Sequence, residues 1–335
     1  MSSAKLKATP ILLTAVVVTA LTGCGPMAGD KGRPGRGGEL LTVDFPAGQT
    51  LRYKFVSSRQ IAVNWDAAGE AAQSANRATD KSSESMEMVV SYSPVEIDPY
   101  GLTTVKATCE SVKVSRSKGP QRDAAESFAG KTFTFAVGPT GKIENYSQLD
   151  ELIKEAGKKA FRANTSQGRI KEPDMINDFV ASQWFLWDAV STIEEPSKGV
   201  AVGQSWRSKL SVPTPMVMRK ARDVTYTLAE VRPGEQGRLA VIRSSYGPAE
   251  SVPRGWPIPY SGSFQPAGAF GFYRNYQVLD LKGEGEELFN IDAGRTQKYS
   301  QHYRMQLKAS LLMPLAGASP TITIDQNLTM TLIED

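Results

Sequence analysis

The fold is decided by residues 86–116, MEMVVSYSPVEIDPYGLTTVKATCESVKVSR. From Met86 to Tyr92 every second side chain is apolar, which is the period of a β-strand with one buried face. Asp98-Pro99-Tyr100-Gly101 then has proline at the second turn position and glycine at the fourth, which suits a type I turn. A second alternating run follows from Leu102 to Arg116. The stretch therefore predicts a long antiparallel hairpin.

The same pattern returns later in the chain, which predicts an internal duplication. Three short stretches of the first half match stretches of the second half in the same order: 48–54 with 203–209, 92–99 with 226–233, and 135–142 with 289–295. We expect two related β units at residues 40–147 and 199–335, with residues 67–83 as an inserted loop. The alternative is that unrelated hairpins share turn chemistry.

Residues 148–198, between the two units, predict a helical connector. Leu149, Ile153 and Ala156 lie at helical spacing, and a second apolar run begins near Pro173 and ends at Pro196. A curved antiparallel sheet has one apolar face that must be covered. The expected fold is therefore α+β and β-rich, with two related curved antiparallel β units joined by a central pair of apolar helices.

The start of the chain has the layout of a secretory signal. Lys5 and Lys7 precede an apolar run, Ile11–Leu21, which is shorter than the ~20 residues that a membrane span needs. The run ends in LTGC, residues 21–24, which resembles the lipobox of bacterial lipoproteins. That resemblance implies removal of residues 1–23 and attachment of lipid to Cys24. The alternative is an ordinary signal peptide that ends near a chance cysteine.

The lipobox resemblance also implies where the protein works. Two or three acyl chains on Cys24 make a durable membrane anchor. Residues 24–39 are rich in glycine and predict a flexible tether with a mean reach of roughly 20 Å. Gly25 is not the aspartate that retains enterobacterial lipoproteins at the inner membrane. We therefore expect a lipid-anchored protein of the cell envelope, on the outer membrane and facing the periplasm.

Composition excludes several classes of function. The formal net charge is +4, and loss of the two signal lysines leaves +2, which argues against a nucleic-acid binder. His302 is the only histidine, in a predicted strand, and Cys109 is the only cysteine after Cys24. Cys109 shares a strand face with Val105 and predicts a buried, inert thiol. We therefore expect no metal site, no cofactor and no enzymatic activity.

One acidic group keeps a catalytic alternative open. Glu284, Glu286, Glu287 and Asp292 lie close together in the sequence and could serve a carboxylate-based hydrolase. A solvated strand edge, on which charges discourage aggregation, is the preferred interpretation.

The aromatic residues predict a candidate apolar pocket. Trp184, Phe185 and Trp187 give the second helix more apolar surface than one stripe needs. Residues 247–272 form an irregular segment whose Trp256, Tyr260 and Phe264 could cover that surface. A pocket lined by these six side chains would suit an acyl chain or another apolar molecule. The alternative is that the rings only fill the core.

In architecture alone, the expected fold resembles the half-barrel of the outer-membrane lipoprotein carrier, where a sheet wraps helices around an apolar cavity. The chain also resembles a family of uncharacterised bacterial lipoproteins with paired β units, which has no assigned activity. Together these expectations predict a non-catalytic, membrane-anchored envelope lipoprotein that binds an apolar ligand or a protein partner. A structural or assembly lipoprotein with a fully packed core is the alternative.

Overall fold

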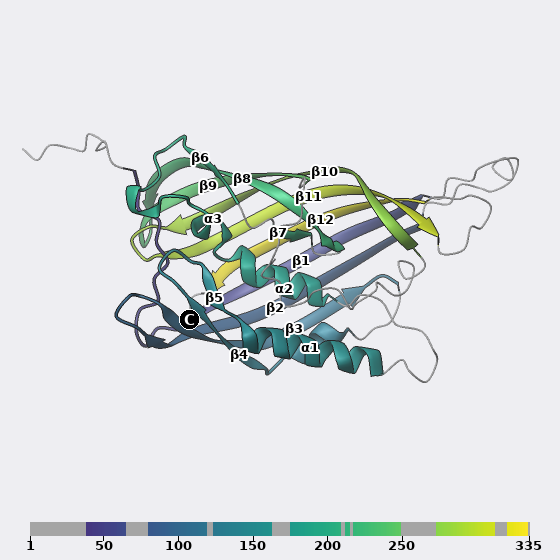
Figure 1. The fold of residues 1–335 in the computed structure, drawn as a ribbon, viewed down its shortest axis with the longest axis horizontal. Coiled ribbons are helices and arrows are strands. Elements are labelled where there is room, and N and C mark those ends of the chain that lie inside the picture. The colour runs from purple at the N-terminus through teal and green to yellow at the C-terminus, as the bar shows by residue number, and fades with distance from the viewer. Residues whose placement is uncertain are drawn as a thin grey trace, which may run out of the picture. The chain divides into compact units, whose positions relative to one another are not determined.

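Strands dominate the structure and meet in one sheet. The computed structural model describes residues 38–64, 80–118, 123–162, 175–208, 212–214, 217–248, 273–311 and 320–333. Within these ranges, 12 strands form one antiparallel sheet in the order β5-β4-β3-β2-β1-β12-β11-β10-β9-β8-β6, with β7 paired to β8 (Figure 1). Their bounds are β1 Leu51–Asn64, β2 Asp80–Ile97, β3 Thr103–Arg116, β4 Thr132–Val137, β5 Ile143–Asn145, β6 Ser205–Arg207, β7 Val212–Thr214, β8 Val217–Gly234, β9 Gly237–Pro248, β10 Tyr273–Asn290, β11 Arg295–Leu311 and β12 Thr321–Ile333.

The predicted hairpin is confirmed. β2 and β3 pair from Glu84 opposite Arg116 to Ile97 opposite Thr103. The Gly101 N–H donates to the Asp98 carbonyl at 3.0 Å and closes the turn. Gly101 has a φ of +83°, a left-handed value that glycine adopts without a steric cost.

The predicted fold class is wrong. Strands account for 61% of the structure, and they form one large sheet instead of two β units joined by a central pair of apolar helices. β1 pairs with β12 from Arg52 opposite Ile333 to Asn64 opposite Thr321, so the first and last strands join the two halves of the chain. Alternation in a sequence identifies a strand and its buried face, but no short turn links β1 to β12 to reveal their pairing.

The helices cover part of the sheet. They are α1 (Ser147–Arg162), α2 (Ile176–Phe185) and α3 (Asp188–Ser191), with 3-10 turns η2 (Ala124–Phe128) and η3 (Pro196–Lys198). Figure 1 shows α1 and α2 lying on one face of the sheet. In the described ranges, no helix is both long and apolar enough to cross a bilayer.

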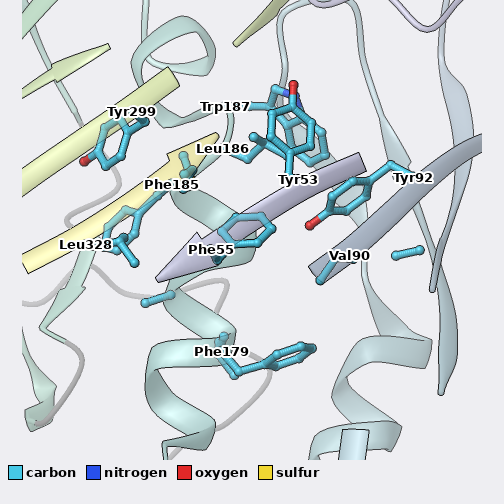
Figure 2. Close-up of a cluster of buried hydrophobic side chains, with 14 of the residues drawn as sticks. Tyr53, Phe55, Val90, Tyr92, Phe179, Phe185, Leu186, Trp187, Tyr299 and Leu328 are labelled. Carbon is cyan, nitrogen blue, oxygen red and sulfur yellow. The ribbon is translucent and has the colours of Figure 1, made fainter. Parts of the chain in front are cut away.

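The face of the sheet that meets the helices is its inner face. On β1, the odd-numbered side chains from Leu51 to Val63 are buried and the even-numbered ones are more exposed. On β12, the even-numbered side chains from Ile322 to Met330 are the buried set. This is the period of two that a pleated strand imposes. Inner-face side chains and residues of α1, α2 and α3 form one cluster, which we call the main core (Figure 2).

Residues 39–45 form an N-terminal strap across one end of the strands. Three backbone contacts hold it there: Glu39 with Val200, Val43 with Pro139, and Asp44 with Gly294. Gly294 has a φ of +60°, and a Cβ at this position would lie 2.7 Å from the Asp44 nitrogen, so a side chain would displace the strap. We call this end of the sheet the strap end.

Two strand pairings agree with the sequence matches. Leu51 lies opposite Tyr92, and Trp206 lies opposite Tyr226. Leu51 matches Trp206 in the sequence alignment of the two halves, and Tyr92 matches Tyr226. The duplication and the domain boundaries that follow from it stay predictions.

Candidate functional site

The predicted pocket residues that the structure describes lie at the junction of α2 and α3. Phe185 and Trp187 are buried, with 1% and 3% of their surface exposed, and Trp184 is half-buried. Trp256, Tyr260 and Phe264 lie outside the described residues, as does Cys24. The geometry of the proposed pocket can therefore be followed for these three side chains.

Trp187 is packed inside an aromatic cluster. Its ring centroid lies 5.8 Å from that of Phe45, 5.8 Å from that of Tyr92 and 5.7 Å from that of Phe135. Gly141 makes room for it, because a Cβ on Gly141 would lie 3.0 Å from the Trp187 Cβ. Figure 2 shows Trp187 and Leu186 beside Tyr53. Edge and tilted ring contacts at these distances are the packing of a filled core.

The two neighbouring aromatic residues contact other parts of the molecule. Phe185 stacks on Tyr299 of β11, with ring centroids 6.2 Å apart and planes 15° apart. Trp184 meets Tyr146 edge-on at 5.5 Å. Each of the three rings therefore packs against a different neighbour, which favours core filling at these positions over a shared ligand pocket.

A row of polar side chains crosses the inner face and divides it. On β1, Ser57 and Arg59 interrupt the series of buried apolar residues, and on β12 Gln326 interrupts it. We use the name polar belt for the hydrogen-bonded group Ser57, Arg59, Glu84, Arg116, Asp123, Asp178, Tyr303 and Gln326. Sequence reasoning missed this group, although the breaks in alternation were a usable signal.

Asp178 of α2 is the centre of the polar belt. It accepts hydrogen bonds from the Arg59 guanidinium at 2.6 Å, from the Ser57 hydroxyl at 2.7 Å and from the Gln326 amide at 2.7 Å. Arg59 also pairs with Glu84, and only 2% of the Arg59 side chain is exposed. A buried charge needs such partners to offset the loss of its hydration. The belt therefore joins α2 to β1 and β12.

The same network reaches the polypeptide before α2. Arg116 bonds Glu84 at 3.3 Å and also pairs with Asp123. Asp123 caps η2 by accepting from the Ala125 N–H at 2.8 Å, and it accepts from the Met175 N–H at 3.1 Å. Asp178 therefore joins α2 to β1, and Asp123 joins η2 and the backbone at Met175 to β3.

A second apolar cluster lies beyond the polar belt on the inner face. We call it the far cluster, and its buried members are Ile61, Val63, Leu281, Tyr303, Met305, Leu307, Ile322 and Ile324. All of them come from β1, β10, β11 and β12, whereas the main core also contains residues of α1, α2 and α3. Their exposed fractions are 6% or less.

Two carboxylates are buried together near the main core. Asp188 of α3 accepts from the Tyr226 hydroxyl and from the Ser208 hydroxyl, the latter at 3.2 Å. Glu287 of β10 accepts from the Thr296 hydroxyl at 2.6 Å, and its second oxygen is buried without a hydrogen-bond partner in the described part of the chain. Burial, with a contribution from the charge of Asp188, raises the pKa of Glu287 to about 8. Glu287 is therefore largely a neutral acid at pH 7.

The acidic residues that could have formed a hydrolase site are dispersed. Glu284 and Glu286 are exposed, while Glu287 points to the inner face. Asp292 lies in the turn after β10 and bonds the Arg238 guanidinium at 2.9 Å. In the ranges that the structure describes, no group of three His, Cys, Asp or Glu side chains could hold a metal ion.

Cys109 and His302 lie as the sequence predicts. Cys109 is fully buried, and its burial raises the pKa of the thiol to about 12. His302 is a half-exposed strand residue whose Nε2 lies 3.1 Å from an oxygen of Asp325. Neither residue has the surroundings of an activated catalytic group.

A polar groove of about 310 Å³ lies on the outer face over β12, β1, β2 and β3. Its lining is polar and includes five serines, Ser58, Ser83, Ser85, Ser115 and Ser117. The groove also borders Arg59 and Arg116, whose guanidinium groups belong to the polar belt on the inner face. It is a water-facing hollow without the apolar walls that an acyl chain needs.

Comparisons with known proteins give a match to a family model and distant likenesses to solved structures. Residues 83–236, which are less than half of the chain, match a family of unknown function (DUF6263). The comparison with curated proteins found no match. A solved structure described as "Lipid-protein interactions in lipovitellin" is similar with a TM-score of 0.45 and 9% identity. The similarity covers 87% of this chain and 26% of the lipovitellin chain, and a likeness this distant carries no argument about ligands.

Proposed function

We propose that this protein is a non-catalytic lipoprotein of the bacterial cell envelope, anchored through lipid on Cys24, whose sheet is a rigid scaffold for an envelope partner. The charged start, the apolar run and LTGC at residues 21–24 support the anchor. The absence of aspartate after Cys24 supports the outer membrane, with the sheet in the periplasm.

One observation carries the scaffold proposal: Trp187 is enclosed by Phe45, Tyr92 and Phe135. Trp187 is one of the six predicted pocket residues, and side chains of the chain itself already pack against its ring. The buried ion pairs of Asp178 and Asp123 add rigidity around this core. Glu287 and Asp188 are also buried, at 2% and 4% exposure, which supports a non-catalytic interpretation over a carboxylate hydrolase.

The anchor is tested in cells fed a fatty-acid analogue that can be detected on protein. The wild-type chain should take up the analogue, and Cys24→Ala should not. Cys109→Ala is the matched control, because that thiol is buried and should not be acylated. Equal labelling of wild type and Cys24→Ala would exclude the anchor.

A second candidate function is apolar ligand binding at the far cluster. It is favoured by the composition of that cluster, which among the residues that the structure describes contains strand residues only and is separated from the main core by the polar belt. Met305 and Ile324 of this cluster are 1% and 0% exposed, so an acyl chain would contact them only by displacing what now buries them. Extraction of the purified protein, followed by mass spectrometry, separates the two functions: stoichiometric lipid beyond the anchor supports a carrier, and its absence supports the scaffold.

A further inference from the structure

Large apolar side chains that stay exposed gather at the strap end. In the part of the chain that the structure describes, the exposed ones are Leu40, Val95, Ile97, Tyr100, Val202 and Leu279. Val95 and Ile97 end β2, and Tyr100 lies in the turn that follows. Leu40 belongs to the strap, and Val202 follows Val200, which bridges the strap. Leu279 alone lies elsewhere, on β10. Scattered apolar residues are normal, but five of six at one end are not scattered.

The strap connects the two parts of this surface. A Cβ on Gly101 would lie 3.7 Å from the Pro139 ring, so the turn with Tyr100 lies against the turn with Pro139. The Pro139 carbonyl accepts from the Val43 N–H at 2.8 Å. Further along the strap, Glu39 bridges Val200 near Leu40 and Val202. The exposed apolar residues therefore border one continuous structural feature.

The chain enters the described structure at this same end. Residue 38 begins the described part, and Cys24 lies 14 residues before it. A glycine-rich tether of this length has a mean reach of roughly 20 Å. Such a tether holds the strap end at a high effective concentration beside whatever surface carries the lipid. A contact too weak to bind a free protein to a membrane is then enough to orient an anchored one.

We propose that the strap end docks on a zwitterionic lipid surface, with Leu40, Tyr100 and Val202 placed in the interfacial layer. This inference rests on the proposed anchor at Cys24. Tyrosine suits that layer because its ring is apolar and its hydroxyl stays hydrated, and Tyr100 is 89% exposed. Docking would direct the opposite end of the sheet away from the membrane.

Charge at the strap end favours a zwitterionic over an anionic surface. Glu96 and Asp98 flank Tyr100, and Asp44 is exposed on the strap. Four basic side chains at this end are paired with acids: Lys142 with Glu144, Lys198 with Glu195, Arg232 with Glu230, and Arg238 with Glu39 and Asp292. A fifth, Arg295, donates to the Gln236 amide oxygen at 3.4 Å. Anionic headgroups attract unpaired basic clusters, and here they would meet exposed carboxylates.

The test places a reporter at the surface of the full, lipidated protein in phosphatidylcholine vesicles. Tyr100→Cys, Val202→Cys and Leu279→Cys are each labelled with a polarity-sensitive fluorophore through a maleimide. Cys109 does not compete, because it is buried and its thiol pKa is raised to about 12. Leu279 is the matched control, since it is an apolar residue of 48% exposure away from the strap end.

Lipid-borne nitroxide should quench the labels at positions 100 and 202 several-fold more than the label at position 279. Vesicles with added phosphatidylglycerol should weaken that difference. Equal quenching at all three positions would overturn the proposal. So would labels that stay unquenched in vesicles yet are shielded in intact envelopes, because that result assigns the surface to a protein partner.

Flotation of the same vesicles separates this inference from the anchor. Protein that floats without quenching at positions 100 and 202 keeps the anchor and excludes docking. Protein that does not float contradicts the anchor, and docking fails with it. The double variant Tyr100→Glu, Val202→Glu supplies a further check, because both sites are exposed: it should keep its unfolding midpoint and lose quenching of a label at Leu40→Cys. Unchanged quenching in that variant also overturns docking.

Discussion

The main core and the far cluster lie on the same inner face and share β1, β10, β11 and β12, yet they are built differently. In the main core, rings from strands and helices interlock, as Trp187 does with Phe45, Tyr92 and Phe135. The far cluster is mostly aliphatic, and all of its members come from strands. In both clusters the alternation of the strands places the side chains on the inner face. The degree of burial therefore does not distinguish the function of the main core from that of the far cluster.

The polar belt is what separates the two clusters. Arg59, Asp178 and Gln326 occupy inner-face space that apolar residues would otherwise fill. A buried charge network is costly unless each member is satisfied, and this one joins α2 to β1 and β12. The comparison therefore assigns rigidity to the main core and leaves the far cluster as the place where a ligand function can be tested.

The largest expected effect is in the main core. Trp187→Ala should lower the free energy of unfolding by about 3–5 kcal/mol, because it leaves a cavity among three aromatic rings. Denaturant titration followed by circular dichroism measures the loss. The partly conservative variant Trp187→Phe should recover much of it. A loss below about 1 kcal/mol would mean that the ring faces open space, as the ligand-pocket hypothesis required.

In the far cluster, Ile324→Ala should cost about 2–5 kcal/mol if the cluster is packed as the scaffold proposal requires. Ile61→Val removes a single methylene from the same cluster and should cost about 1 kcal/mol. Thermal unfolding with and without added oleate checks both. A small loss for Ile324→Ala, together with a midpoint that rises with oleate only in the wild type, would assign a ligand to this cluster.

The sequence predicts local structure well in this chain. Residues 86–116 form the expected hairpin, and Leu149, Ile153 and Ala156 fall within α1. The single second helix that was predicted is wrong: the chain forms two short helices, α2 and α3, and Trp187 lies between them. Cys109 is buried because it follows the strand period of Val105 and Ala107. These features depend on neighbours a few residues apart, and so periodicity and turn chemistry are enough to reveal them.

Long-range pairing is what the sequence does not reveal. The pairing of β1 with β12 joins residues more than 250 positions apart, and no turn marks it. Arg59 and Asp178 form an ion pair although 119 positions separate them in the sequence. Taken singly, each residue predicts only a solvent-exposed charge. The sequence indicates that the aromatic residues near 185 are apolar surface that needs cover, but their neighbours Tyr299, Tyr92 and Tyr146 depend on the tertiary fold.

A smaller effect is expected at Glu287, which lies on the inner face of β10. Its folded-state pKa of about 8 is above the ordinary value of 4.5, so the folded state holds a proton that the unfolded state releases. Stability from this group is fully present below pH 4.5 and is lost as the pH rises towards 8, by at most about 1.4 kcal/mol per pH unit.

Glu287→Gln keeps the shape and stays neutral at every pH. It should therefore flatten the stability profile between pH 5 and pH 8 relative to the wild type. Unfolding midpoints in denaturant across this range measure the difference. Parallel profiles for the two proteins would mean that Glu287 is ionised in the folded state.

A smaller effect than at Trp187 is expected at Trp184, and it bears directly on function. Trp184 is half-buried and, within the described ranges, makes one ring contact, of 5.5 Å with Tyr146, whereas Trp187 makes three. Trp184→Ala loses one aromatic pair, worth about 0.5–1.5 kcal/mol beyond its buried area, and the burial of only part of a ring, so its cost should be well below that of Trp187→Ala. In the scaffold proposal, neither Trp184→Ala nor Tyr146→Ala changes the response to a fluorescent fatty acid, because no acyl chain lies between the two rings. A titration of the wild type and both variants with that probe measures this. Saturable binding by the wild type that Trp184→Ala abolishes, at the small stability cost expected here, would assign a ligand site to the α2 aromatic residues.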